Sequence, residues 1–327
     1  MSVEDPSNEA QRKEGAAQQP AAGATRSAVG DAPYESIEAN GLRFGYLQAG
    51  RGPLVLCIHG FPDVPDTFAR LLDRLAQAGY HAVAPATRGI YPTSAPRDGD
   101  YSPLRLGQDA LALIDAFGAR SAAIVGHDWG AMSAYAAANL DPARVARMVT
   151  IAIPHPRAIR MSLHLMRRGW HFAVLPIPFV AEFLARRSDF ALLRHLRRSW
   201  SPNMHPSSQQ MTRLRESYRH PGTLTAALRY YRSFPLTFAG IGKSGKQSHE
   251  ILFRKTSVPA LCFAPMADAV FDEATFDRTR DAFTGHYELV KLKEAGHSPH
   301  LEPSKQFFEQ RVLDFLRSSS QGGRVER

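Results

Sequence analysis

The segment Gly126-His127-Asp128-Trp129-Gly130 combines a reactive carboxylate with two glycines at the spacing that a sharp turn requires. The apolar run 122–125 before it predicts a buried strand, and the small residues 131–138 after it predict a helix. A strand that turns into a helix through Gly-x-nucleophile-x-Gly presents its middle side chain for chemistry. A carboxylate is ionised at neutral pH and can displace a leaving group from saturated carbon. We therefore expect Asp128 to be a nucleophile that forms an alkyl ester.

A second reactive side chain near the C-terminus could complete such a reaction. His297 lies in the segment Ala295-Gly296-His297-Ser298-Pro299-His300-Leu301-Glu302-Pro303, which follows a predicted strand at 287–292. A neutral imidazole can take a proton from a water that then attacks the carbonyl of the ester. The two side chains would thus divide one difficult substitution into two easier steps. His300 and Glu302 are expected to be structural.

The elements that must position these residues alternate between strands and helices, which predicts a mostly parallel sheet with right-handed crossovers. Asn40-Gly41 between two short runs predicts a hairpin ahead of this pattern. The predicted strands are 34–38, 42–46, 54–58, 81–84, 122–125, 145–153, 258–263 and 287–292. The predicted helices of the same region are 67–77, 103–117, 131–138, one from about 273, and 305–316.

The alternation stops at Pro154-His155-Pro156, and the residues up to about 250 are typical of helices rich in Arg, Leu and Phe. We therefore predict an α/β core formed by residues 31–153 and 252–320, with a helical cap at 154–251. Residues 1–30 show no hydrophobic period, and we expect them to form a disordered extension.

Composition narrows the classes of function. The 327 residues are 44% hydrophobic and 22% charged, as in a globular protein, and two cysteines cannot form a disulfide framework. The N-terminus lacks the pattern of a signal peptide, and charged residues and prolines interrupt the apolar tract 161–185. The net charge of +9 comes without a nucleic-acid-binding motif. We expect a cytoplasmic protein with solvated arginines that binds neither nucleic acid nor membrane, and a homodimer is left open.

Taken together, residues 34–318 resemble the α/β-hydrolase superfamily, in the branch of epoxide hydrolases and haloalkane dehalogenases. The resemblance rests on the order of four motifs: His59-Gly60-Phe61-Pro62, the Asp128 turn, an acid after the next-to-last strand, and Gly296-His297. It implies an α/β-hydrolase fold, a mostly parallel sheet flanked by helices with an inserted cap. It implies water as co-substrate, and we expect neither metal nor cofactor.

The resemblance also assigns roles in the core. Asp268 stands where the family has Gly-x-x-Asp, although Pro265 replaces the glycine, and would orient His297. Asp272 is the nearby alternative. The backbone N–H groups of Phe61 and Trp129 would form the oxyanion hole, and a cis Phe61–Pro62 bond is implied.

The cap is expected to distinguish an epoxide from a halide. An epoxide oxygen leaves poorly unless it is protonated, and the family uses two cap donors for this purpose. Tyr231, in Leu228-Arg229-Tyr230-Tyr231-Arg232, matches one donor position, and His171 occupies the other, where most relatives have tyrosine. The adjacent Tyr230 is expected to have a packing role and not to be a donor. A dehalogenase would instead hold the halide with N–H donors, for which Trp129 and Trp170 are candidates.

Three functions compete on these residues. We favour hydrolysis of a small apolar epoxide to a vicinal diol through an ester on Asp128. Hydrolytic dehalogenation of a haloalkane is the alternative, although Phe61 replaces the asparagine of a common halide site. Trp129 stands where an arginine would bind an acidic substrate, and the pocket is expected to include Trp129, Phe61 and Trp170. A catalytically slow ligand-binding protein on the same scaffold is the third hypothesis.

Overall fold

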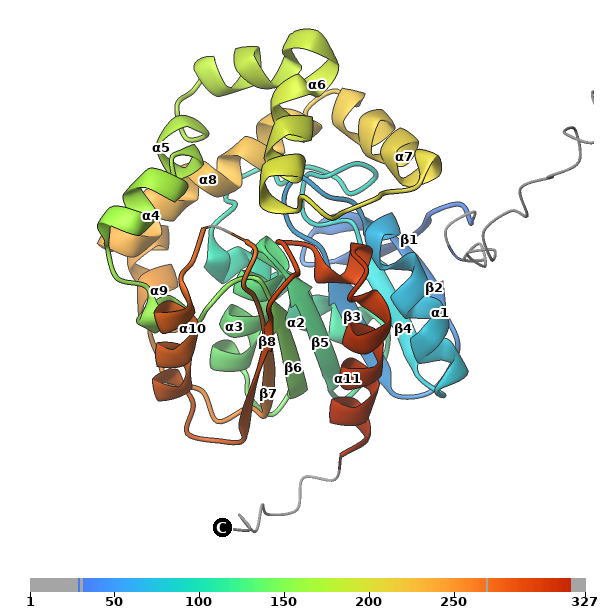
Figure 1. Ribbon diagram of the computed structural model, residues 1–327. Helices are drawn as coiled ribbons and strands as arrows, with labels where there is room; N and C mark the ends of the chain where they lie inside the picture. Colours follow the sequence, from blue (N-terminus) through green and yellow to red (C-terminus); the bar gives the residue numbers. More distant parts are fainter. Residues whose placement is uncertain (1–28, 30–31, 269, 319–327) are drawn as a thin grey trace, which may run out of the picture.

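An eight-stranded sheet forms the centre of the computed structural model, which describes residues 29, 32–268 and 270–318 (Figure 1). Its strand order is β1-β2-β4-β3-β5-β6-β7-β8, with β1, β2 and β4 paired antiparallel and the pairs from β4 to β8 parallel. The strands are β1 (Glu35–Ala39), β2 (Leu42–Ala49), β3 (Leu54–Ile58), β4 (His81–Pro85), β5 (Ala122–His127), β6 (Val145–Ile151), β7 (Ala260–Pro265) and β8 (Tyr287–Leu292). The predicted α/β fold is confirmed.

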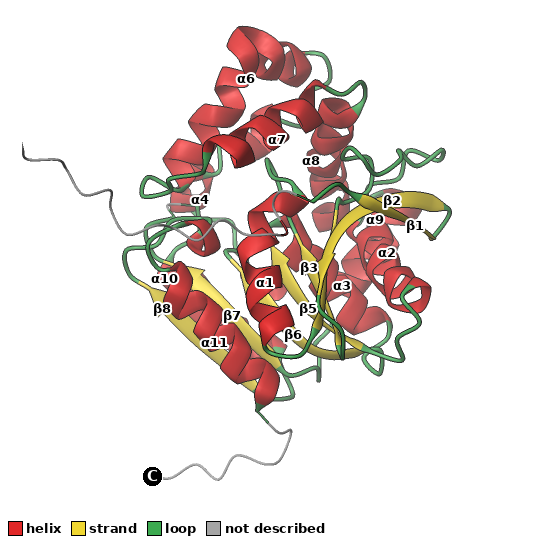
Figure 2. Cartoon of the chain, turned by 90° about the vertical axis from the view of Figure 1, so that its right-hand side faces the viewer, coloured by secondary structure: helices red, strands yellow, loops and turns green. Residues whose placement is uncertain are grey.

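Helices cover both faces of the sheet, because the central strands are apolar on both sides (Figure 2). On one face, α1 (Ala69–Gln77) and α11 (Lys305–Arg317) pack Leu72, Leu75 and Phe308 against the sheet. On the other face lie α2 (Pro103–Ala116) and α3 (Trp129–Leu140). Two short elements, η4 (Pro65–Phe68) and α10 (Glu273–Arg278), accompany this core.

The segment between β6 and β7 is helical, and most of it lies over one end of the sheet, while its last helix packs beside α2 and α3 (Figure 1). We call this segment the cap. Its helices are α4 (Leu163–Arg168), α5 (His171–Val174), α6 (Val180–Trp200, with a kink at 187–190), α7 (Ser208–Arg219), α8 (Thr223–Ala239) and α9 (Gly242–Leu252). No helix within the described residues is long and apolar enough to cross a membrane. The predicted disordered extension lies outside the described residues, apart from Val29, which is buried.

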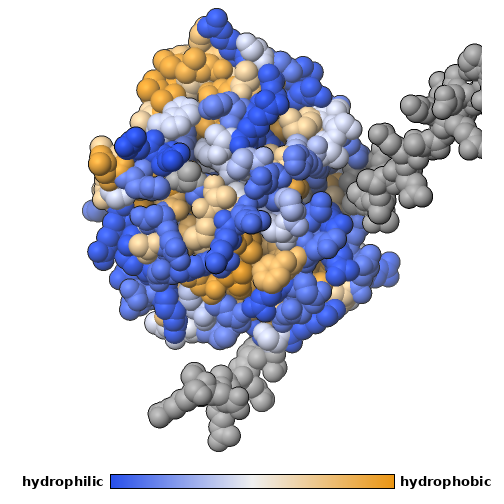
Figure 3. All heavy atoms as spheres, viewed as in Figure 1, coloured by the Kyte–Doolittle hydropathy of each residue, from blue (hydrophilic) through white to orange (hydrophobic). Residues whose placement is uncertain are grey.

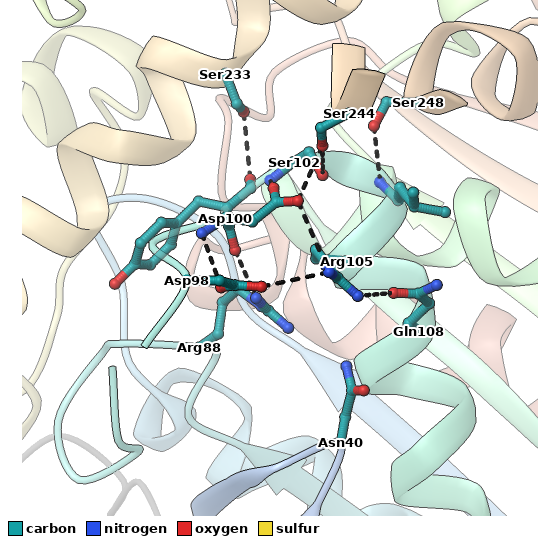
Figure 4. Close-up of polar contacts among 12 residues, drawn as sticks. Asn40, Arg88, Asp98, Asp100, Ser102, Arg105, Gln108, Ser233, Ser244 and Ser248 are labelled. Carbon is teal, nitrogen blue, oxygen red and sulfur yellow. Dashed lines mark hydrogen bonds and ion pairs between the residues drawn. The ribbon is translucent and has the colours of Figure 1, made fainter. Parts of the chain in front are cut away.

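Polar contacts fasten the end of the cap to the core (Figure 4). Ser244 of α9 donates a 2.9 Å hydrogen bond to Asp100, in the loop before α2. Ser248 of α9 accepts from the backbone N–H of Leu104, and Ser233 of α8 donates to the carbonyl of Tyr101. These bonds fix α8, and therefore the side chains that it carries, relative to the sheet.

Candidate active site

Asp128 lies at the turn between β5 and α3, and its backbone has φ 53° and ψ −117°. This conformation is costly for a residue with a side chain and is held by the close packing of its neighbours. A Cβ on Gly130 would lie 1.9 Å from the carbonyl oxygen of Ile58, and a Cβ on Gly126 would lie 2.2 Å from that of Gly130. The two glycines thus allow the tight turn that places the carboxylate beneath the cap.

His297 lies between two carboxylates. Its Nδ1 is 2.7 Å from Oδ2 of Asp268, and its Nε2 is 3.6 Å from Oδ2 of Asp128. The Nε2 atom has no hydrogen-bond partner in the part of the chain that the structure describes. The ring is therefore oriented by Asp268 and directs a free nitrogen at the expected nucleophile.

The charge of this histidine depends on both carboxylates. Burial lowers the pKa of His297, but the negative charges of Asp268 and Asp128 outweigh burial and raise it to about 10. The imidazole is therefore protonated at neutral pH. Loss of the charge on Asp128 would lower the pKa of His297 and make it a better base.

Asp272, the alternative acid, lies elsewhere. Its Oδ1 accepts a 2.8 Å hydrogen bond from the backbone N–H of Thr275 and a 2.5 Å bond from its hydroxyl. This is the geometry of an N-cap, here at the start of α10. Of the two candidates, the structure brings Asp268 to His297.

The backbone N–H of Phe61 donates a 2.7 Å hydrogen bond to Oδ1 of Asp128. The Phe61–Pro62 peptide bond is cis, as the resemblance implies. Gly60 permits this approach, since a Cβ there would lie 2.3 Å from the side chain of Asp128. Trp129 begins α3, so its N–H is among the helix N-terminal groups that lack an intrahelical acceptor. Both predicted oxyanion donors therefore lie beside Asp128.

Tyr231 and His171 are buried in the cap on the side that faces this centre. Their rings lie 6.3 Å apart, and Tyr231 packs edge-on against both Phe61 and Trp129 at 5.1 and 5.4 Å. Burial and the charge of Asp128 raise the pKa of Tyr231 well above its ordinary value, against a smaller effect of a hydrogen bond with the Trp129 side chain. The phenol therefore stays protonated.

The His171 side chain is uncharged at neutral pH. Burial lowers its pKa to about 4, with Asp128 raising it and His297 lowering it further. Its Nδ1 has no hydrogen-bond partner among the described residues. Two neutral hydrogen-bonding groups of the cap thus lie near one carboxylate of the core.

Tyr230, next to Tyr231, has a different environment. Its hydroxyl donates a 2.8 Å hydrogen bond to the carbonyl of Arg88, whose guanidinium forms a buried ion pair with Asp109 at 2.6 Å. The two adjacent tyrosines therefore have different partners. Tyr230 hydrogen-bonds the core backbone at Arg88, and Tyr231 lies beside the expected nucleophile.

Two tryptophans of the cap differ from the sequence-based expectation. Trp170, predicted to line the pocket, is 40% exposed on the cap surface. Trp200, which the sequence did not single out, is buried with its ring 5.3 Å from His297 and 4.8 Å from His171. Its carbonyl also accepts a 2.8 Å bond from the backbone N–H of His297. Nothing in the local pattern distinguishes Trp200, because its role depends on how α6 meets the core.

A buried polar cluster lies behind His297. Within the described residues, Asp63, His127 and His300 offer ligand atoms that lie within 4.8 Å of one another, a spacing that could hold a metal ion. However, Arg197 of α6 pairs with Asp63 at 3.0 Å and also donates to the carbonyl of Pro62. A guanidinium in this position repels a second cation. We therefore interpret the cluster as a link between the cap and the oxyanion-hole loop.

The sheet, the turn that carries Asp128 and the adjacent histidine are the features of an α/β hydrolase. The family model of the alpha/beta hydrolase fold matches residues 53–304. The AB hydrolase superfamily protein YfhM of Bacillus subtilis is 29% identical over 86% of this chain and 97% of its own length. Epoxide hydrolase 4 of Mus musculus is 31% identical over 81% of this chain and 74% of its own.

A solved structure agrees with these sequence matches. Epoxide hydrolase A of Mycobacterium thermoresistibile superposes with a TM-score of 0.71 and 26% identity, over 88% of this chain and 98% of its own. The chain belongs to the α/β-hydrolase family, and within that family to the epoxide hydrolase branch.

Proposed function

We propose that this protein hydrolyses small apolar epoxides to vicinal diols through a covalent ester on Asp128. The observation that carries the proposal is the position of Asp128, which lies between His297 of the core and two hydrogen-bonding groups of the cap. The relatives named as epoxide hydrolases support the reaction class. The ester mechanism is our inference from the residues.

In the first step, Oδ2 of Asp128 attacks a ring carbon of the epoxide and the carbon–oxygen bond of the ring breaks. Oδ1 is held by the N–H of Phe61 at 2.7 Å, which leaves Oδ2 as the attacking atom. Tyr231 and His171 hydrogen-bond the departing oxygen, and Tyr231 transfers its proton to that oxygen, which completes a hydroxy ester. The tyrosinate then regains a proton from solvent. Opening therefore combines a nucleophile below the substrate with proton donors above it.

Formation of the ester removes the charge of Asp128, so His297 releases its proton before the second step. The neutral imidazole then takes a proton from water, and the water oxygen attacks Cγ of the ester. The ester has no negative charge, so only Asp268 still raises the pKa of His297, and the imidazole is a better base at this stage than before. Negative charge develops on Oδ1, which already lies in the hydrogen bond from Phe61. His297 then passes its proton to Oδ2 as the Cγ–Oδ2 bond breaks, which releases the diol and restores the carboxylate.

An apolar substrate fits the surroundings of Asp128. Trp129 packs against Tyr231 and Phe234, and Phe234 stacks on Phe172 at 4.9 Å. A small cavity reaches Trp129 from the other side and is lined by Gly60, Phe61, Thr87, Ile90, Trp129, Tyr218, Ala227 and Tyr230. The aromatic side chains around Asp128 favour a small, uncharged epoxide.

Dehalogenation has less support. Of the two proposed halide donors, Trp170 is 40% exposed on the cap surface, and the Trp129 ring is covered by Tyr231, which packs edge-on against it at 5.4 Å. A binding protein without catalysis would not require His297 between two carboxylates.

Purified protein should be assayed with styrene oxide for diol and with a 1-bromoalkane for released bromide. We expect the wild type to form diol from styrene oxide and to release little bromide from the bromoalkane. Asp128→Asn should form no diol. Efficient bromide release without diol formation would replace this proposal with dehalogenation.

A further inference from the structure

The outer surface of the cap carries large apolar side chains that the fold leaves in solvent. They are concentrated in residues 161–184, which form α4, α5, the loops around them and the start of α6. The most exposed are Phe179 (86%), Met161 (79%), Leu163 (73%), Met166 (63%) and Phe183 (63%). Apolar side chains gathered in this way on a globular protein mark an interaction surface.

The space-filling view shows the same concentration. Hydrophobic residues gather over the end of the cap where α5 and the start of α6 lie in Figure 1, and hydrophilic residues border them (Figure 3). Exposed apolar side chains come from two parts of this surface: α4 with Leu163 and Met166, and the start of α6 with Phe179 and Phe183. We call residues 160–187 the cap apolar surface.

The charge of the cap apolar surface is positive. Residues 160–187 contain five arginines and one acidic residue, Glu182, which forms an ion pair with Arg232 at 2.6 Å. No acidic partner within ion-pair distance is found, among the described residues, for these arginines: Arg160, Arg167, Arg168, Arg186 and Arg187. They are exposed and lie beside the apolar side chains.

We propose that the cap apolar surface binds the surface of an anionic lipid bilayer. Exposed Phe, Leu and Met side chains can enter the boundary between headgroups and acyl chains, while neighbouring arginines contact anionic headgroups. The charge favours this occupant over a second copy of the chain, because two such surfaces facing each other would bring ten arginines together. This differs from the expectation that the protein does not contact membranes.

Membrane binding would also bear on the substrate. The cap that carries this surface also carries Tyr231 and His171, so binding would bring the active site close to the phase in which apolar epoxides dissolve. This consequence rests on the proposed function, whereas the binding itself does not.

Vesicle flotation without substrate tests the proposal, since it does not depend on catalysis. Wild-type protein should float with vesicles of phosphatidylcholine mixed with phosphatidylglycerol, and much less with phosphatidylcholine alone. Phe179→Ser combined with Phe183→Ser should weaken binding about tenfold or more, because two apolar anchors are lost. Arg167→Gln combined with Arg168→Gln should remove most of the preference for anionic vesicles.

Phe307→Ser is the matched control, because Phe307 is 52% exposed on α11 of the core, away from the cap. It should bind vesicles as the wild type does, and all variants should hydrolyse a water-soluble epoxide at the wild-type rate. Equal binding by the Phe179 and Phe183 double variant would overturn the proposal. The proposal would also be overturned if the wild type did not bind vesicles and sedimentation velocity showed it to be a dimer that the double variant dissociates.

Discussion

The backbone N–H of Phe61 donates a 2.7 Å hydrogen bond to Oδ1 of Asp128. The two oxygens of the carboxylate therefore have different environments. Oδ2, which lies 3.6 Å from Nε2 of His297, is the oxygen that can attack. Oδ1 is already in the position where charge would develop when water attacks the ester, so the oxyanion donor needs little reorganisation.

Tyr231→Phe should reduce kcat/KM for an epoxide by about a hundredfold, because the departing oxygen loses a proton donor. Steady-state kinetics measure this effect. Tyr230→Phe is the control, since its hydroxyl bonds to the carbonyl of Arg88 and not to the expected substrate position. It should cost about 1 kcal/mol of stability with little change in kcat/KM. Similar kinetic losses in both variants would argue against Tyr231 as the donor.

Asp128→Asn should lower the pKa of His297 from about 10 towards 6.5, because one of the two negative charges that raise it is removed. NMR titration of the imidazole, assigned with His297→Gln, measures the change. The pKa of His297 is raised in the folded state, so the charged ring contributes stability at low pH that is lost as pH rises through about 10. An unchanged titration in the Asn variant would mean that Asp128 does not control this base.

Arg197→Met should destabilise the protein by about 3–5 kcal/mol, because Asp63 is left buried without its partner at 3.0 Å. Urea denaturation measures the loss. Burial raises the pKa of Asp63 and Arg197 lowers it, so the pKa should rise further in the variant. The destabilisation should therefore be smaller in acid than in alkali, since protonation removes the unpaired charge.

The double variant Arg197→Met with Asp63→Asn separates this explanation from a simple loss of packing. It should recover much of the stability, because the unpaired charge is gone. A double variant as unstable as the sum of the two single variants would contradict the ion-pair account.

Trp200→Leu should reduce kcat/KM by about tenfold or more, because the ring packs on both His297 and His171. Trp170→Leu, the matched change on the cap surface, should leave kcat/KM close to that of the wild type. Both variants should be assayed well below their unfolding temperatures, as measured by thermal unfolding followed by circular dichroism. A larger loss at Trp170 would favour the pocket expected from the sequence.

The core of this site could be predicted from the sequence because it depends on local motifs. Residues 126–130 encode a turn that few other sequences allow. The alternation of strands and helices places Asp128, Asp268 and His297 after the carboxyl ends of parallel strands, at the same end of the sheet. Even Pro265, which departs from the family pattern, lies at the end of β7 and does not prevent Asp268 from reaching His297 at 2.7 Å.

The cap was less predictable, because its helices are positioned by contacts with distant parts of the chain. The direction of Trp200 depends on α6, which is kinked at 187–190 and is joined to the core by Arg197 and Asp63. The position of Trp170 on the surface follows from the same packing, and no period in the sequence encodes it. Tyr231 was identified because its segment resembles that of the family. The hydrogen bond of the adjacent Tyr230 to the carbonyl of Arg88 is known only from the structure.

The covalent route through Asp128 is tested most directly by a single turnover in ¹⁸O-labelled water, with enzyme in excess over styrene oxide. Mass spectrometry of the diol and of the peptide that contains Asp128 locates the label. The account predicts an unlabelled diol, whose new oxygen comes from Oδ2, and one ¹⁸O in Asp128. A labelled diol with no label in Asp128 would show direct attack by water and contradict the ester mechanism.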